Sequence, residues 1–260
     1  MLRPRLIPCL LLDGERLVKT KRFRDPQYVG DPINAIRIFN DKEVDELMLI
    51  DISASRLGRP PDFDLIEQLA GECFMPLCYG GGIRDAGDAR RLYASGVEKV
   101  CLQSAFFERP ELAREIADHA GEQAVVVSID VEEAGGDRRL RKPGRGSVRY
   151  PGWEAAVVGA AAHGAGEILL NNASRDGTLA GLDLDLMRKA ADLIEVPLVA
   201  AGGTNSLDDA RAAVAAGASA VAIGAFFVFY GPHRAVLITY PTPNELADLW
   251  DNHFEQGRSE

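Results

Sequence analysis

Residues 76–82 read Pro-Leu-Cys-Tyr-Gly-Gly-Gly, and residues 197–203 read Pro-Leu-Val-Ala-Ala-Gly-Gly. Each stretch is a short apolar run that ends in glycines, which is typical of a buried strand followed by a tight turn. Taken singly, such a turn can be a turn and nothing more. However, the final glycines lie 121 positions apart (203 − 82), and two further pairs share this spacing: Glu46 with Glu167, and Phe106 with Phe227. The common spacing indicates an internal repeat, in which a unit of four strands and helices occurs twice.

Around these stretches, short apolar runs alternate with segments of helical periodicity. The candidate strands are residues 6–12, 46–52, 76–79, 100–103, 124–129, 167–170, 197–201 and 220–223. The main candidate helices are residues 62–72, 86–95, 111–120, 153–163, 184–194 and 207–216, with one more starting near Asn34. Repeated strand–helix alternation predicts a parallel sheet, and nearly continuous apolar strands predict that both of its faces are covered. Two halves of four units close naturally into one α/β barrel of the (β/α)8 type, a TIM barrel.

We expect a single domain over residues 1–260, with half-barrels at about 1–121 and 122–230 and a C-terminal tail with a helix at 231–260. The net charge of −10 and the pI near 5.0 leave no general basic surface, which argues against nucleic-acid binding. A leader-like start and a run of about 18 apolar residues are both missing, so we expect a cytoplasmic protein without membrane association. The cysteines and histidines show no metal-ligand spacing, and nothing indicates a metal or another cofactor.

In a barrel of this type the functional residues follow the strands, because the loops at the C-terminal ends of the strands form one mouth. Glycine-rich turns at that end can direct backbone N–H groups at an anion. We define a first-half cradle, which comprises Gly81 and Gly82 with Gln103 and Ser104. The second-half cradle comprises Asp176 and Gly177, Gly202 and Gly203, and Gly224 and Ala225. Together the cradles predict a ligand with two phosphate groups, bound at opposite edges of the mouth.

Two further features lie near this mouth. Residues 19–24 read Lys-Thr-Lys-Arg-Phe-Arg and form a basic cluster within a long connection from Asp13 to about Pro32. A lid that brings Lys19 to the ligand and a solvated charge run are both consistent with this pattern. Asp130 ends the predicted strand Val-Val-Ser-Ile-Asp. Its carboxylate is therefore expected to point into the mouth as a general acid or base, or else to cap the next turn.

A separate set of charges precedes the strands. Arg5, Glu46, Lys99 and Glu167 lie at the N-terminal ends of their strands, so they are expected to meet at the opposite end of the barrel. We call these four residues the charged ring. Two acids and two bases in that position can seal the bottom of the barrel for stability, or they can gate a passage through it.

From Arg5 to about Phe229 the chain resembles the cyclase subunit of imidazole glycerol phosphate synthase. The resemblance rests on Arg-Leu-Ile-Pro-Cys-Leu at 5–10, Asp-Ile-Ser-Ala-Ser at 51–55, Gly-Gly-Gly-Ile at 80–83, Gly-Ala-Gly-Glu-Ile-Leu-Leu at 164–170, Arg-Asp-Gly-Thr at 175–178 and Ala-Gly-Gly at 201–203. In that family a glutaminase partner docks on the N-terminal face, and ammonia crosses the barrel to the active site. The resemblance therefore implies that the charged ring gates an ammonia passage, and that a glutaminase is a partner of this chain.

One of the family's two catalytic carboxylates is missing. Asp130 matches the second acid, which transfers protons while ammonia closes the imidazole ring, but the position of the first acid holds Leu11, which cannot transfer a proton. Gln103 and Asn171 stand where the family usually has Asn and Thr, and Ser104 replaces Thr. We therefore expect an altered pocket, in which Asn171, Lys19 and the two cradles are the candidate contacts for a phosphorylated small molecule.

Residues 11–14, 17–20, 28–35 and 229–237 resemble a divergent branch associated with acetamidino modification of surface-polysaccharide sugars. In that branch the barrel and a glutaminase supply ammonia to a separate sugar amidotransferase, which acts on a nucleotide-activated N-acetyl sugar. The resemblance implies an ammonia-channelling subunit of this kind in lipopolysaccharide or related glycan biosynthesis. The alternatives are a working cyclase of histidine biosynthesis, with another group in place of the missing acid, and a catalytically silent scaffold that only activates its glutaminase.

Overall fold

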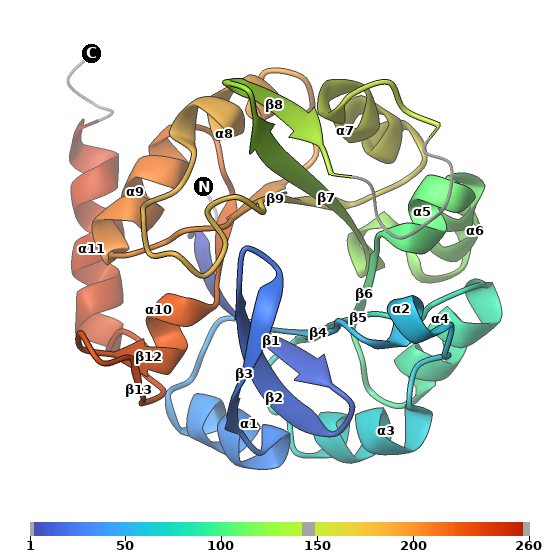
Figure 1. The fold of residues 1–260 in the computed structure, drawn as a ribbon, viewed down its shortest axis with the longest axis horizontal. Helices are drawn as coiled ribbons and strands as arrows, with labels where there is room; N and C mark the ends of the chain where they lie inside the picture. The colour runs from blue at the N-terminus through green and yellow to red at the C-terminus, as the bar shows by residue number, and fades with distance from the viewer. Residues whose placement is uncertain (1–2, 142–148, 257–260) are drawn as a thin grey trace.

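The computed structural model describes residues 3–141 and 149–256. Three short segments lie outside the described ranges: residues 1–2 at the start of the predicted first half-barrel, residues 142–148 within the second, and residues 257–260 at the end of the predicted tail. Within them, eight parallel strands close into a barrel, as predicted (Figure 1). The strands are β1 (Arg5–Asp13), β4 (Leu47–Asp51), β5 (Leu77–Gly80), β6 (Lys99–Leu102), β7 (Val125–Ala134), β9 (Glu167–Asn172), β10 (Leu198–Ala201) and β11 (Ala220–Ile223). The barrel closes where β1 pairs with β11 and Arg5 lies beside Ala220.

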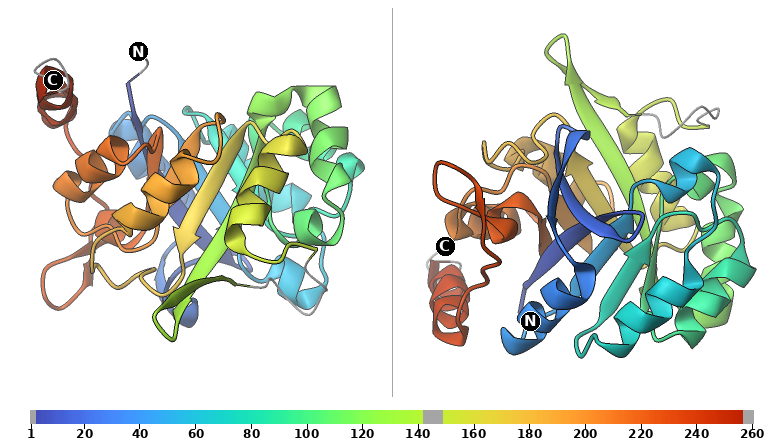
Figure 2. Two further views of the ribbon diagram at one scale, coloured as in Figure 1. Left: turned by 90° about the horizontal axis from the view of Figure 1, so that it is seen from above. Right: turned by 60° about the horizontal axis from the view of Figure 1, so that its bottom comes forward.

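Helices cover the outside of the barrel (Figures 1 and 2). The longer ones are α1 (Pro32–Asp41), α3 (Phe63–Gly71), α4 (Ala86–Ala94), α6 (Glu111–Ala120), α7 (Trp153–Ala162), α8 (Leu184–Ala191), α9 (Leu207–Ala215) and α11 (Pro243–Gln256). The short ones are α2 (Ala54–Leu57), α5 (Ser104–Glu108), α10 (Ala225–Val228) and the 3-10 helix η1 (Glu122–Ala124). The repeat extends to the helix caps, because Asp62 accepts a hydrogen bond from Leu65 N at 3.1 Å and Asp183 accepts one from Leu186 N at 3.1 Å. Equivalent aspartates therefore start α3 and α8.

Side chains alternate along each strand between the outside and the inside of the barrel. Outward-facing residues such as Leu6 pack beneath the helices in the main hydrophobic core. Inward-facing apolar side chains form a second cluster, which we call the inner cluster: Ile7, Met48, Cys78, Cys101, Val126, Leu169, Val199, Ala201, Ala220 and Ala222. On β1 the inward positions run from Arg5 through Ile7 and Cys9 to Leu11. The charged ring, the inner cluster and the mouth are therefore successive layers along one axis.

The connection after β1 is a hairpin rather than a loop. Residues 13–32 contain β2 (Arg16–Lys21) and β3 (Arg24–Gly30), which extend β1 as antiparallel strands. The strands were missed because their burial does not alternate: residues 17–20 are all buried, whereas β3 is almost entirely exposed. Neither pattern is the two-residue period from which strands are predicted. Figure 1 shows this hairpin across the face of the barrel.

The strand that carries Asp130 is longer than predicted. β7 continues past Asp130 to Ala134 and pairs with β8 (Asp137–Leu140), so the prediction that Asp130 ends its strand is wrong. Gly135 and Gly136 adopt φ angles of +64° and +87°, which allow the tight reversal between the two strands. A further short hairpin pairs β12 (Phe229–Tyr230) with β13 (Ala235–Val236) after the last barrel strand.

The C-terminal tail covers the barrel with one more helix. α11 packs beside α9, where Leu249 and Trp250 are buried and Arg211 Nε donates a hydrogen bond to Leu249 O at 3.2 Å. Ahead of the helix, Tyr240 Oη donates to Leu6 O at 3.0 Å and ties the tail to β1. Among the described residues, no helix combines the length and the apolar character needed to cross a bilayer.

Candidate functional site

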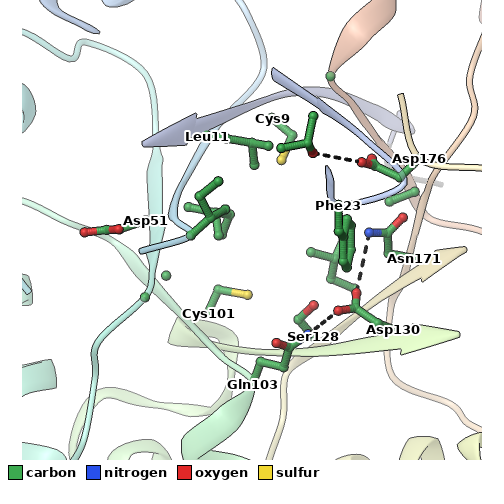
Figure 3. Close-up of a pocket in the computed structure, with 18 of the residues that line it drawn as sticks. Cys9, Leu11, Phe23, Asp51, Cys101, Gln103, Ser128, Asp130, Asn171 and Asp176 are labelled. Carbon is green, nitrogen blue, oxygen red and sulfur yellow. Dashed lines mark hydrogen bonds between the residues drawn. The ribbon is translucent and has the colours of Figure 1, made fainter. Parts of the chain in front are cut away.

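A cavity of about 1260 Å³ lies at the C-terminal ends of the strands (Figure 3). The predicted mouth residues that line it are Leu11, Lys19, Gly81, Gly82, Gln103, Ser104, Asp130, Asn171, Asp176, Gly177, Gly202, Gly203, Gly224 and Ala225. Both cradles and Asp130 therefore share one space, although they come from different halves of the chain. A space of this size accommodates a small phosphorylated metabolite.

Asp130 is buried in the wall of this cavity. Gln103 Nε2 donates a hydrogen bond to Asp130 Oδ2 at 2.6 Å, and Asn171 Nδ2 donates to Oδ1 at 3.5 Å (Figure 3). Burial raises the pKa of Asp130 from 3.8 to about 6, although these two donors act in the opposite direction. The carboxyl group can therefore exchange a proton close to neutral pH. Leu11 lies across the cavity from it, with a side chain that has no proton to transfer (Figure 3).

Lys19 is not part of a solvated charge run. The residue is 5% exposed, and its Nζ donates a hydrogen bond to Cys9 O. A Cβ atom added to Gly224 would lie 2.6 Å from Nζ, so the ammonium group sits directly against the second-half cradle. Burial lowers the pKa of Lys19, while the nearby Cys9 and Asp176 act to raise it. The Lys19 side chain therefore lies in the wall of the cavity, directly beside the second-half cradle.

Replacing Lys19 with methionine is expected to weaken the binding of inorganic phosphate at the second-half cradle on the order of tenfold, because a charge-assisted contact is lost. An NMR titration measures this through the amide signals of Gly203 and Gly224. The amide signals of Gly81 and Gly82 report the first-half cradle, which is expected to keep its affinity. An equal loss at both cradles, or no loss at either, would contradict this placement of Lys19.

The β2–β3 hairpin closes one side of the mouth. Arg22 N donates a hydrogen bond to Asp176 O at 2.9 Å, which attaches the hairpin tip to the loop after β9. Phe23 projects into the cavity near Asp130 (Figure 3), and the Arg141 guanidinium lies 5.0 Å from the centre of its ring. The connection that the sequence left between a lid and a solvated charge run is therefore a hairpin, whose tip holds an aromatic ring within the cavity.

The sequence did not single out every residue that lines the cavity. Those it missed include Cys9, Phe23, Ile50, Cys101, Ser128, Arg141 and Thr204. Some could have been found by counting back two positions along a strand from a predicted inward residue: Ser128 from Asp130, and Cys101 from Gln103. Phe23 could not, because its position depends on the unpredicted hairpin.

The charged ring forms at the other end of the barrel. Arg5 donates from Nη1 to Glu46 Oε2 and from Nη2 to Glu167 Oε1, the latter at 2.7 Å. Lys99 Nζ donates to the same two oxygens, at 2.8 Å and 3.1 Å. The remaining oxygens, Glu46 Oε1 and Glu167 Oε2, are buried and have no hydrogen-bond partner among the described residues. Each cation bridges both acids, so the four side chains close the N-terminal end of the barrel.

The fold and the mouth define a (β/α)8 barrel of two similar halves, with glycine-rich turns paired across one cavity. The sequence pattern of the family described as histidine biosynthesis protein matches residues 5–233. The chain therefore belongs to that family.

Three relatives carry a more specific, provisional name. The chain is 49% identical over 255 residues to imidazole glycerol phosphate synthase subunit hisF2, as it is provisionally named in Pseudomonas aeruginosa, with 95% of this chain and 99% of that protein covered. It is 46% identical over 253 residues to the provisionally named subunit HisF of Leptospira borgpetersenii, with 96% and 100% covered. It is 45% identical over 253 residues to the provisionally named subunit hisF3 of Vibrio vulnificus, with 94% and 95% covered.

Proposed function

We propose that this chain is a cyclase-like barrel subunit that receives ammonia from a glutaminase at its N-terminal face and passes it to the mouth. A separate amidotransferase then uses the ammonia for acetamidino modification of a nucleotide-activated sugar, in the biosynthesis of lipopolysaccharide O-antigen or a related glycan. One observation carries the proposal: a charged ring closes one end of the barrel, while Leu11 faces Asp130 at the other. A subunit that only passes ammonia onward needs an entrance for ammonia, but it does not need the second catalytic acid that closing an imidazole ring requires.

The barrel interior supports the passage of an uncharged molecule. Between the charged ring and the cavity lies the inner cluster, whose members carry apolar or thiol side chains. Its members on β10 and β11 include Ala201, Ala220 and Ala222, which occupy little space. Moving an ammonium ion through such a lining costs far more than moving neutral ammonia, because the ion loses its hydration. The layer arrangement therefore favours delivery of ammonia in its reactive, uncharged form.

The alternative function is a working cyclase of histidine biosynthesis, and one observation favours it. Asp176 lines the cavity, and burial raises the pKa of its carboxyl group. A buried acid of this kind is a candidate for the proton transfer that Leu11 cannot perform. The charge of nearby Lys19 and the hydrogen bond that Thr20 Oγ1 donates to Asp176 Oδ2 argue for a structural role instead, because both lower the pKa of Asp176.

A direct assay separates the two functions. The purified chain is supplied with ammonium chloride at alkaline pH and with the ribonucleotide substrate that the family's cyclases close into an imidazole ring. We expect no turnover, whereas ring closure at ordinary cyclase rates would defeat the proposal. In parallel, the chain is combined with glutamine, a nucleotide-activated N-acetyl sugar, a glutaminase and a sugar amidotransferase. We expect the amidinated sugar nucleotide to form only when the chain is present.

A substitution that blocks the barrel interior distinguishes an ammonia-channelling subunit from a scaffold that only activates its glutaminase. Ala222→Leu enlarges an inner-cluster residue at the floor of the cavity, so glutamine-dependent amidination is expected to fall on the order of tenfold or more. Glutaminase activity and amidination from added ammonium are expected to persist. Val221→Leu is the matched control, because its side chain faces the outer core on the same strand. If Ala222→Leu changed nothing while glutaminase activity still required the chain, the chain would be an activating scaffold.

A further inference from the structure

A second cavity, of about 640 Å³, adjoins the cavity at the mouth, and we call it the side cavity. Its lining comprises Asp13, Gly14, Arg16, Val18, Pro26, Tyr28, Leu57 and Arg59. Asp13, Pro26 and Leu57 also line the mouth cavity, so the two spaces meet along these side chains. The side cavity combines two arginines, an aromatic ring and apolar side chains, and it contains neither of the phosphate cradles.

One wall of the side cavity is a face of the β2–β3 hairpin. Arg16 and Val18 lie two positions apart on β2 and therefore share a face, and Val18 pairs with Tyr28 of β3. The side chain of Tyr28 is 60% exposed. Among the described residues its ring contacts neither another aromatic ring nor a cation. The face of this ring is therefore free to stack against a ligand.

Arg59 belongs to the opposite wall, where its position is fixed by a buried hydroxyl. Arg59 Nη2 donates a hydrogen bond to Ser53 Oγ at 3.0 Å, and Gly14 N donates to the same oxygen at 3.3 Å. Ser53 is fully buried, and its hydroxyl donates in turn to Asp51 Oδ1 at 2.8 Å. These bonds hold the guanidinium group of Arg59 beside the turn between β1 and β2, with its other N–H groups still available to a ligand.

The two arginines of the side cavity have no carboxylate partner. Within the described ranges neither Arg16 nor Arg59 forms an ion pair, although Asp13 lies opposite Arg16 in the strand register. Around the second half of the mouth, by contrast, ion pairs with carboxylates engage Arg138, Arg141 and Arg175. Unpaired guanidinium groups gathered on a chain with a net charge of −10 favour a local anion site.

We propose that the side cavity binds a nucleoside diphosphate, with its phosphates at Arg16 and Arg59 and its base against Tyr28. Guanidinium groups donate paired hydrogen bonds to phosphate oxygens, and a base stacks on an exposed aromatic ring. Because the side cavity adjoins the mouth, a sugar carried on the second phosphate can extend toward the mouth. The binding site stands without the proposed function, and only the link between this sugar and ammonia delivery rests on it.

The test is an NMR titration of the full chain with UDP and, separately, with its parts uridine and pyrophosphate. The amide signal of Gly14 reports the side cavity, and that of Gly203 reports the mouth. We expect UDP to shift the Gly14 signal and to bind on the order of tenfold more tightly than either part, because only UDP reaches both the guanidinium groups and the ring. If UDP shifts the signal of Gly203 but not that of Gly14, the inference is wrong.

Three substitutions at exposed positions sharpen the result. Arg16→Met is expected to weaken UDP binding on the order of fivefold or more, and Tyr28→Leu is expected to abolish the preference for UDP over pyrophosphate. Arg139→Met is the matched control, because Arg139 is an exposed arginine of β8 that lines neither cavity.

Two results with these variants would overturn the inference. Equal losses for Arg16→Met and Arg139→Met would mean that UDP responds to net charge rather than to a site. Pyrophosphate that binds the unmodified chain as tightly as UDP would remove the contact with the base. A chain that binds UDP in the side cavity but supports no amidination would keep this site while the proposed function fails.

Discussion

Replacing Glu46 with alanine is expected to lower the free energy of unfolding by about 3 kcal/mol, the cost of breaking a buried ion pair by removing one partner. Glu46 is only 2% exposed, and its Oε2 accepts hydrogen bonds from both Arg5 and Lys99. Without it, the two cations must share Glu167 in a largely buried site. Urea unfolding followed by circular dichroism measures the loss.

An exposed ion pair of similar geometry is the matched control. Arg37 Nε lies 3.0 Å from Glu72 Oε2, but the side chains are 57% and 38% exposed. Glu72→Ala is therefore expected to shift the urea unfolding midpoint far less than Glu46→Ala does, because solvent screens the exposed pair. The double variant Glu46→Ala/Lys99→Ala is expected to recover part of the loss, because it removes one cation together with the acid. Equal losses for the exposed and the buried pair would show that the charged ring is open to solvent.

The barrel was predictable because its strands are buried on both sides. In β5, β10 and β11 every residue is buried, which gives the continuous apolar runs that indicate a parallel sheet. The repeat then limited the topology to two similar halves. The hairpins beyond the rim were not predictable in the same way, because the four buried residues of β2 include Lys19 and Thr20 and β3 is almost entirely exposed. In β8, for example, the residues read Asp-Arg-Arg-Leu, so three of the four are charged and the stretch has no apolar run.

The candidate site was predictable where backbone position alone decides the geometry. Glycine pairs after equivalent strands, and inward residues such as Asp130, reach the cavity because parallel strands end at one rim. The sequence did not decide whether Lys19 belongs to a lid over the ligand or to a solvated run of surface charges. That choice depends on burial of its side chain, which the β2–β3 hairpin causes. Asn171 Oδ1 and Thr204 Oγ1 are buried and lack a hydrogen-bond partner in the described part of the chain, which also depends on the packed structure. Sequence identifies which residues reach a cavity, but hydrogen-bond pairing is decided only by the fold around them.

Replacing Asp130 with asparagine is expected to stabilise the chain at alkaline pH, by about 2 kcal/mol more at pH 8 than at pH 4. Burial raises the pKa of Asp130 from 3.8 to about 6, so the folded chain binds a proton more tightly than the unfolded chain does. Between these values the free energy of unfolding falls as the pH rises, because folding then requires a buried negative charge. Asparagine keeps the shape and one acceptor oxygen but carries no charge, so the variant lacks this fall.

The sign of the effect separates a functional acid from a structural one. A carboxylate held by the fold through its charge would have a lowered pKa, and its replacement would destabilise the chain most at high pH. Urea unfolding of both proteins across the pH range measures the difference, with Asp118→Asn, an exposed position on α6, as the control expected to stay within about 0.5 kcal/mol throughout. A destabilised Asp130→Asn variant at pH 8 would mean that Gln103 and Asn171 stabilise the charge more than burial opposes it. The expected gain instead means that the folded barrel tolerates an unfavourable carboxylate in its mouth, which is typical of a group kept for its chemistry.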